Sequence, residues 1–248
     1  MSRSLVLSYG ILSYALGMGG LVYFILFVGG WNFLPFHIDS DEPGPLAPAL
    51  LINTSLVVLL GLQHSVMARA GFKQAWTKVI PPAAERSTYV LLSGVVFFLI
   101  GCYWQAIAGT FWQVDQGIAR ILLTAIQLSG WALVVVSSFL INHFELFGLQ
   151  QVYSHFAGKP EPAPHFTDRF LYKIVRHPLQ LGVLIGIWSS ATMTMTHLML
   201  SVSMTLYVFI GLYFEEKDLV ATLGQDYENY QRRVRMIVPI PKRTSTEK

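Results

Sequence analysis

Two clusters of titratable residues flank one long hydrophobic stretch in the second half of the chain. Arg176 and His177, followed by Pro178, precede this stretch, and Glu215 and Glu216 end it. Side chains of these types can pair with one another, or can bind a ligand that offers a carboxylate, hydroxyl groups or a positive charge. A structural interpretation stays open, because proline often opens a helix and charged residues often flank membrane helices.

The hydrophobic stretch itself, residues 179–214, determines whether the two clusters meet. A bilayer core of ~30 Å needs about 20 helical residues, so this stretch is too long for a single crossing. Residues 192–197 in its middle are short, polar or β-branched, which favours a turn between two helices. We therefore predict a folded-back hairpin that brings Arg176 and His177 to Glu215 and Glu216 at one membrane surface. We also expect a soluble tail from Glu215 onward.

Three further side chains could take part in proton transfer or anion binding. His64 lies near the end of a hydrophobic stretch, Arg86 opens the next one, and His143 follows the fourth, two residues before Glu145. Ionisable groups within membrane segments are functional candidates by default, although a buried histidine bonded to a neighbouring helix is the simpler alternative for His64. A metal site built from His64, His143 and Glu145 is a further alternative.

The composition indicates an integral membrane protein with one domain over residues 1–248. Of the 248 residues, 53% are hydrophobic and only 12% are charged, against about 25% charged in soluble domains. The hydrophobic runs follow one another too closely for a second independent core. The single cysteine, Cys102, excludes a disulfide framework and a cysteine-based metal site.

Hydropathy predicts an all-α fold with four transmembrane helices and the hairpin, which makes six membrane segments. The first part, residues 1–145, holds the four helices, and residues 146–248 hold a loop, the hairpin and the tail. With this topology all but one of the 17 basic residues lie on the side of both termini, and only Arg120 lies opposite. Because Lys and Arg are enriched in cytoplasmic loops, both termini are expected in the cytoplasm.

The ordered motifs of the C-terminal half resemble the isoprenylcysteine carboxyl methyltransferase superfamily of membrane enzymes. They are Arg-His-Pro at 176–178, Glu-Glu-x-x-Leu at 215–219, and Gly-x-x-Tyr-x-x-Tyr at 224–230 with the later Val234 and Pro239. The resemblance implies S-adenosylmethionine as cofactor, in a cytoplasmic pocket between the first two motifs. A purely structural alternative for the third motif is an amphipathic helix lying on the bilayer, with its tyrosines as anchors.

A closer resemblance extends over nearly the whole chain. Gln63-His64-Ser65, Glu85-Arg86-Ser87, the run at 142–148 and Gln151-Val152-Tyr153 are similar to the bacterial methanethiol S-methyltransferases, which make dimethyl sulfide from methanethiol. A group of denitrification-associated membrane proteins shares part of this pattern. Gln180 is a departure, because the superfamily often has Tyr at this place.

The resemblance implies roles for the candidate residues and a bacterial inner membrane location. Gln151, Tyr153, Arg176, His177, Glu215 and Glu216 would bind the cofactor, with Arg176 on its carboxylate and Glu215 or Glu216 on its ribose. From the chemistry of the reaction, His64 is the expected base for the thiol, ahead of His143 held by Glu145, and Arg86 or Arg69 would stabilise the thiolate. The resembled families need no metal ion.

Other functions stay open at this point. The acceptor could instead be a lipid or prenylcysteine carboxylate, which would need a lipid-facing tunnel. A transporter or an accessory protein of another membrane complex is the non-enzymatic alternative, although transporters often contain internal repeats and this chain has none. The expected partners are a small thiol and the bilayer, without nucleic acid, and the oligomeric state is left open.

Overall fold

The computed structural model describes residues 2–31, 34, 36–160 and 167–240. Within these ranges, five helical segments are long and apolar enough to cross a membrane. They are α1 (Arg3–Gly29), α2 (Leu46–Ala68), α4 (Glu85–Tyr103) with the 3₁₀ turn η1 (Pro82–Ala84) before it, α5 (Ile118–Ile141) and α9 (Met195–Leu223). The chain is therefore a mostly helical integral membrane protein, as the composition predicted.

The predicted hairpin is present, but its two arms are unequal. Its first arm, α8 (Pro178–Trp188), has 11 residues. At 1.5 Å per residue it rises ~16 Å, about half of a bilayer core, so α8 alone cannot be counted as a sixth spanning helix. The second arm, α9, does not end where the sequence places the start of a soluble tail. It continues to Leu223, so Glu215 and Glu216 lie within the helix, about two turns before its end.

The turn between the arms contains a short strand, which corrects the all-α prediction. β2 (Thr192–Thr194) pairs antiparallel with β1 (Thr110–Gln113) from the connection between α4 and α5. Thr110 lies opposite Thr194, and Gln113 lies opposite Thr192. The β-branched residues that favour a break between helices also suit a strand, and pairing satisfies the backbone groups that leave the helices.

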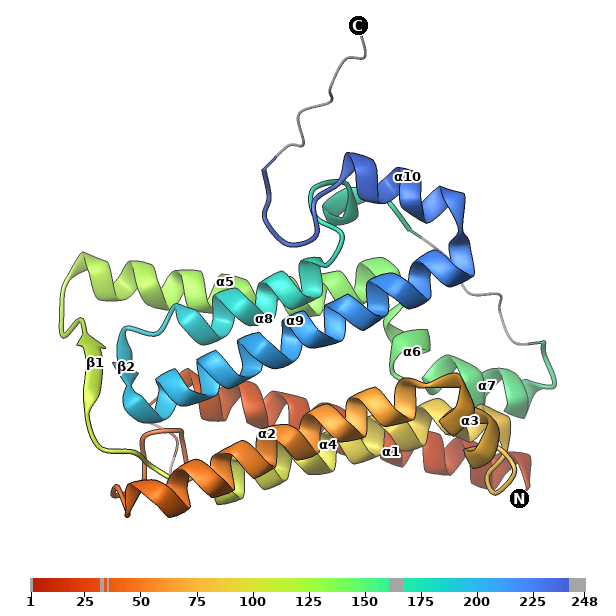
Figure 1. Ribbon diagram of the computed structural model, residues 1–248. Coiled ribbons are helices and arrows are strands. Elements are labelled where there is room, and N and C mark those ends of the chain that lie inside the picture. The colour runs from red at the N-terminus through yellow and green to blue at the C-terminus, as the bar shows by residue number, and fades with distance from the viewer. Residues whose placement is uncertain (1, 32–33, 35, 161–166, 241–248) are drawn as a thin grey trace, which may run out of the picture.

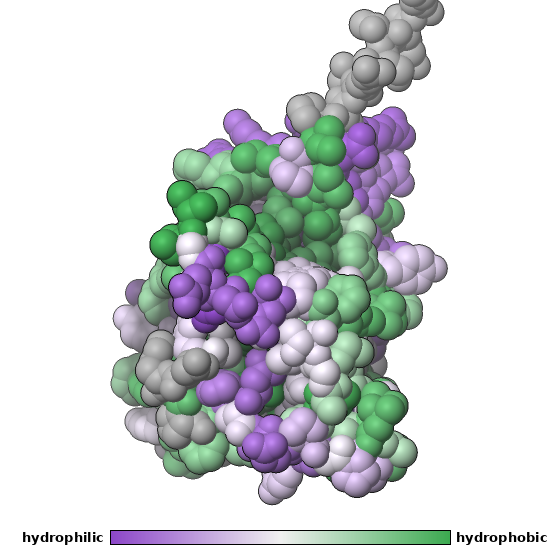
Figure 2. Space-filling model, turned by 90° about the vertical axis from the view of Figure 1, so that its left-hand side faces the viewer, coloured by the Kyte–Doolittle hydropathy of each residue, from purple (hydrophilic) through white to green (hydrophobic). Residues whose placement is uncertain are grey.

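The long helices form two groups that lie side by side (Figure 1). α1 packs on α4 with α2 beside it, while α5 packs on α8, and α9 contacts both α8 and α2. The start of α1 and the end of α9 lie at one end of the molecule, and β1 and β2 lie at the other. Figure 2, which looks from the β1–β2 end, shows hydrophobic side chains over much of the surface and hydrophilic ones in separate patches.

Glycines allow two helix pairs to approach closely. A Cβ on Gly94 of α4 would lie 2.6 Å from the Cα of Gly17 in α1, and a Cβ on Gly182 of α8 would lie 2.6 Å from the carbonyl oxygen of Gly130 in α5. Neither position can hold a side chain without moving the partner backbone. Small residues at helix contacts are the usual device for packing within lipid.

Shorter elements surround the end of the molecule that carries the N-terminus. They are α3 (Ala70–Trp76), α6 (His143–Leu146), α7 (Leu149–Ala157), the 3₁₀ turn η2 (Phe170–Lys173) and α10 (Gln225–Arg233). Arg120 lies near the start of α5, at the β1–β2 end, and bonds the carbonyl of Val114. The predicted separation of Arg120 from the other basic residues is therefore seen, although Lys242, Arg243 and Lys248 lie outside the described residues.

Candidate active site

The carboxylate of Glu216 is the centre of a dense polar network. It accepts hydrogen bonds from Arg176 Nε at 2.9 Å and Nη2 at 2.6 Å, and from His177 Nε2 at 2.6 Å. Tyr227 and Gln231 of α10 add bonds of 2.8 and 2.7 Å. We call these five residues the Glu216 network. Because a carboxylate accepts the bond, His177 carries its proton on Nε2.

Arg176 also donates to groups outside Glu216. Nη1 donates to the carbonyl of Val234 at 2.5 Å, and the backbone N–H groups of Arg176 and His177 donate to the carbonyls of Arg235 and Met236. The Arg176 side chain is only 8% exposed. The hairpin thus brings the Arg-His-Pro and Glu-Glu motifs together, as the sequence predicted. The contacts of Arg176 join segments of the fold, whereas the sequence had suggested that this residue binds a ligand carboxylate.

The two tyrosines of α10 are buried, so they are not the bilayer anchors that one interpretation of this helix expected. Tyr227 and Tyr230 are each 2% exposed, and Tyr230 donates to the carbonyl of Tyr172 at 2.6 Å. Burial and the adjacent Glu216 carboxylate raise the pKa of Tyr227, so its hydroxyl stays protonated and can donate. Their spacing of three residues, one helical turn, was the available signal that both face one partner.

Glu215, next to this network, has a different environment. Its side chain is 48% exposed, with His177 Nδ1 at 3.9 Å and Gln180 Nε2 at 3.4 Å. Arg86 of α4 also lies within electrostatic range of this carboxylate. Glu215 is therefore an accessible carboxylate beside an imidazole and a guanidinium that come from two other elements. Gln180, at the position where the superfamily often has Tyr, contacts this group directly.

Two tyrosines are neighbours of both Glu215 and His64. Tyr89 of α4 and Tyr207 of α9 are both within electrostatic range of Glu215, and their ring centroids lie 5.2 and 6.0 Å from that of His64. The Arg86 guanidinium lies 4.7 Å above the Tyr89 ring and donates from Nε to the carbonyl of Leu146 at 2.7 Å. We call Glu215, Arg86, Tyr89, Tyr207 and His64 the Glu215 cluster. The sequence had not identified Tyr207, which lies in an uninterrupted apolar run.

His64 is surrounded by aromatic rings and lacks a hydrogen-bond partner within the described residues. Besides the two tyrosines, Phe97 lies 6.3 Å away between ring centroids. Nδ1 of His64 is buried. The alternative of a histidine bonded to a neighbouring helix does not describe this side chain.

His143, in contrast, is fully engaged in the structure. Ser138 donates its hydroxyl proton to the Val135 carbonyl, so its oxygen accepts from His143 Nδ1 at 2.9 Å. Nε2 then accepts from the hydroxyl of Tyr14 at 2.8 Å. Burial lowers the pKa of His143 and keeps the ring neutral. Glu145 bonds Asn142 at 3.0 Å, so the expected pairing of His143 with Glu145 is absent here.

The two candidates on α7 differ in their surroundings. Gln151 donates to the carbonyl of Glu145, and its Oε1 is buried without a hydrogen-bond partner within the described residues. A buried acceptor left unpaired in this way is a candidate partner for a ligand donor. Tyr153 is 56% exposed, and in the described part of the chain no hydrogen bond joins it to the Glu215 cluster. Among the described residues, no three His, Cys, Asp or Glu side chains come close enough to hold a metal ion.

The fold and these groups define a class of protein, namely an integral membrane protein with an accessible, titratable cluster at one end of its helices. Comparison with known proteins identifies the family. The chain is 42% identical over 243 residues to the methanethiol S-methyltransferase of Mycobacterium tuberculosis, covering 98% of this chain and 99% of that protein. It is 43% identical over 239 residues to that of Crocosphaera subtropica, covering 96% and 93%. The chain therefore belongs to the methanethiol S-methyltransferase family and is a membrane methyltransferase, as the motifs predicted.

More distant relatives come from animals. Nurim of Rattus norvegicus is 28% identical over 179 residues, covering 69% of this chain and 68% of that protein. No family model matches the chain. No solved structure matches it either.

Proposed function

We propose that the protein transfers a methyl group from S-adenosylmethionine to methanethiol, giving dimethyl sulfide and S-adenosylhomocysteine. The observation that carries this proposal is the Glu215 cluster. The exposed Glu215 carboxylate and His64, whose Nδ1 is buried without a partner within the described residues, share the neighbours Tyr89 and Tyr207. The family relationship supplies the reaction type. When bound, S-adenosylmethionine supplies a methyl group that its sulfonium cation has activated.

The residues of the cluster fit this cofactor. Glu215 can accept bonds from ribose hydroxyls, and the unpaired Oε1 of Gln151 can accept another. Glu216 and backbone carbonyls already use most donors of Arg176, which leaves this residue little capacity to pair with the cofactor carboxylate. The rings of Tyr89 and Tyr207 can support a sulfonium by cation–π attraction.

His64 is the proposed general base. A thiol of this kind has an ordinary pKa of ~8.5 or above and is mostly protonated at neutral pH, whereas the thiolate is the nucleophile. Nε2 of His64 would accept the proton from sulfur, and the positive field of Arg86 would favour the anion. The aromatic rings around His64 give it apolar surroundings, which suit a small apolar acceptor.

The location follows from the charge distribution. Basic residues gather at the end of the molecule that carries the N-terminus and α10, which supports the proposal that this end and the Glu215 cluster face the cytoplasm. We further propose the bacterial inner membrane, where the cytoplasmic supply of S-adenosylmethionine reaches the cluster directly.

The test is an assay of the purified protein with labelled S-adenosylmethionine and an acceptor panel of methanethiol, larger thiols and a prenylcysteine carboxylate. Methanethiol should be methylated most efficiently, and dimethyl sulfide should appear in the gas phase. Preferential methylation of the carboxylate would contradict the proposal, and so would failure to bind the cofactor.

His64→Ala should lower turnover ~10²–10⁴-fold while cofactor affinity stays nearly unchanged. His155→Ala on α7 is the matched control and should be near normal. The defect of His64→Ala should shrink as pH rises towards the thiol pKa, because the acceptor then ionises unaided. A defect independent of pH would assign His64 to positioning and remove it as the base.

A further inference from the structure

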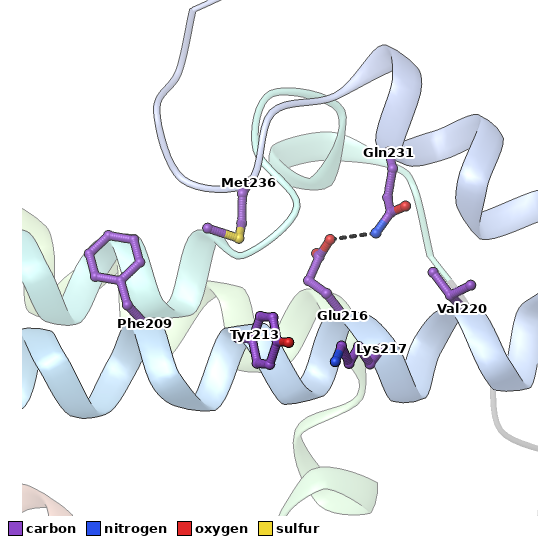
Figure 3. Close-up of a pocket in the computed structure, with 7 residues that line it drawn as sticks. All are labelled: Phe209, Tyr213, Glu216, Lys217, Val220, Gln231 and Met236. Atoms are coloured by element: carbon purple, nitrogen blue, oxygen red, sulfur yellow. Dashed lines mark hydrogen bonds between the residues drawn. The ribbon is translucent and has the colours of Figure 1, made fainter.

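A groove of about 550 Å³ runs between α9 and the segment that follows α10. Figure 3 shows that α9 supplies one wall, with Phe209, Tyr213, Lys217 and Val220, and that Met236 and Gln231 face them. The spacing of the α9 residues at intervals of three or four places them on one face of the helix. The groove is therefore a continuous, mainly apolar surface along α9, with a volume typical of small-molecule sites.

The polar side chains of the groove are not equivalent. Glu216 and Gln231 bond one another at 2.7 Å within the Glu216 network, and Glu216 also neutralises Arg176. Lys217 lies at the opening, with Nζ 4.3 Å from the centre of the Tyr213 ring. Within the described residues no carboxylate lies within ion-pair distance of Lys217, so it is the charge that the groove offers to a ligand.

The position of the groove identifies its environment. Phe209 and Tyr213 are 43% and 57% exposed and continue the lipid-facing surface of α9. Lys217 follows one turn after Tyr213, where the apolar part of the helix ends. Val238, in the segment after α10, is a further exposed apolar side chain, at 52%. Aromatic and basic side chains in this order mark the boundary between hydrocarbon and headgroups.

We propose that this groove binds an anionic phospholipid of the cytoplasmic leaflet. An acyl chain would lie against Phe209, Tyr213 and Met236, and the lipid phosphate would meet Lys217. A smaller neighbouring hollow is lined by Arg232 and Glu228. Arg232 would be a second cation for the headgroup, and Glu228 would reduce the net positive charge of this hollow. A lipid in this place would contact both α9 and the segment after α10 and would bridge them. It would thereby stabilise the Glu216 network from the membrane side.

The test is lipid retention by the purified full chain in detergent, measured by native mass spectrometry with phosphatidylglycerol and phosphatidylcholine of identical acyl chains. We expect phosphatidylglycerol to be retained more strongly and to raise the melting temperature more. Lys217→Gln should weaken phosphatidylglycerol retention about fivefold, to the level of phosphatidylcholine. Lys78→Gln, an exposed lysine at the same end of the molecule, is the matched control and should change nothing.

A second variant, Met236→Trp, fills the groove and should reduce the retention of both lipids. Equal retention of the two lipids by the unmodified protein would overturn the inference, as would unchanged phosphatidylglycerol retention in Lys217→Gln. Because Lys217 is exposed, its variant is expected to fold, so the test does not depend on the behaviour of Met236→Trp. Neither measurement requires methyl transfer, so the result is independent of the proposed function.

Discussion

Replacing Glu216 by glutamine should destabilise the protein far more than the same change at its neighbour Glu215. The amide would keep one acceptor oxygen but would present an N–H₂ group to donors that now bond a carboxylate. Arg176, 8% exposed, would lose its ion-pair partner at 2.6 Å. Breaking a buried ion pair on one side typically costs about 3–5 kcal/mol, because the remaining charge stays buried and uncompensated.

The five hydrogen bonds to Glu216 cannot simply be added. Each bond to a charged group contributes about 1.5–3 kcal/mol by itself, but members of one network are not independent. We therefore expect a loss of about 3–5 kcal/mol for Glu216→Gln. Glu215 is 48% exposed and forms only long contacts, so Glu215→Gln should cost less than about 1 kcal/mol.

The assay is equilibrium unfolding in mixed micelles, followed by tryptophan fluorescence, together with calorimetric binding of S-adenosylmethionine. Glu216→Gln should lower the free energy of unfolding, whereas Glu215→Gln should stay stable and bind the cofactor more weakly. The double variant Arg176→Met with Glu216→Leu should lose less stability than the two single variants added together, because it leaves no buried charge. If Glu216→Gln were as stable as Glu215→Gln, the structural role assigned to the network would be refuted.

Three further predictions follow from the packing and the hydrogen bonds. Gly94→Ala should cost about 1–3 kcal/mol of unfolding free energy by overpacking α1 against α4, measured by thermal unfolding. Gly19→Ala is the control and should fold normally, because no atom lies within 4 Å of the added Cβ. Burial lowers the pKa of His143, so the unfolded chain binds its proton first. Stability should therefore fall as pH drops below ~6.5 and be flat above it, and melting curves of His143→Gln should lose that part of the dependence. Tyr227→Phe removes a 2.8 Å bond to Glu216 and should cost about 1.5–3 kcal/mol of unfolding free energy; an unchanged midpoint would contradict the bond.

Much of the membrane architecture could be predicted because it depends on local sequence. A run of about 20 apolar residues can satisfy its backbone in lipid only as a helix, so the positions of α1, α2, α4 and α5 follow from hydropathy. The fold-back between α8 and α9 followed from length in the same way. The length of α8 and the pairing of β1 with β2 could not be predicted, because these depend on contacts between segments about 80 residues apart.

The candidate site could likewise be predicted only in part. The residue types at 176–177 and 215–216 were sufficient to predict that these clusters would meet, since a hairpin must return them to one side. Only the tertiary structure separated the two adjacent glutamates, which point in different directions on α9. Glu216 faces Arg176 and α10, and Glu215 keeps an accessible carboxylate.

The two candidate histidines show most clearly what the sequence could not predict. By itself the sequence determined that His64 and His143 lie near the ends of hydrophobic segments, on the side rich in basic residues. The tertiary structure decided that Tyr14 and Ser138 occupy both ring nitrogens of His143, whereas aromatic rings surround His64 without bonding it. The physical reason is that the hydrogen-bond partners of a side chain come from other helices. The rotation of those helices and their depth in the membrane depend on packing, which local hydropathy does not encode.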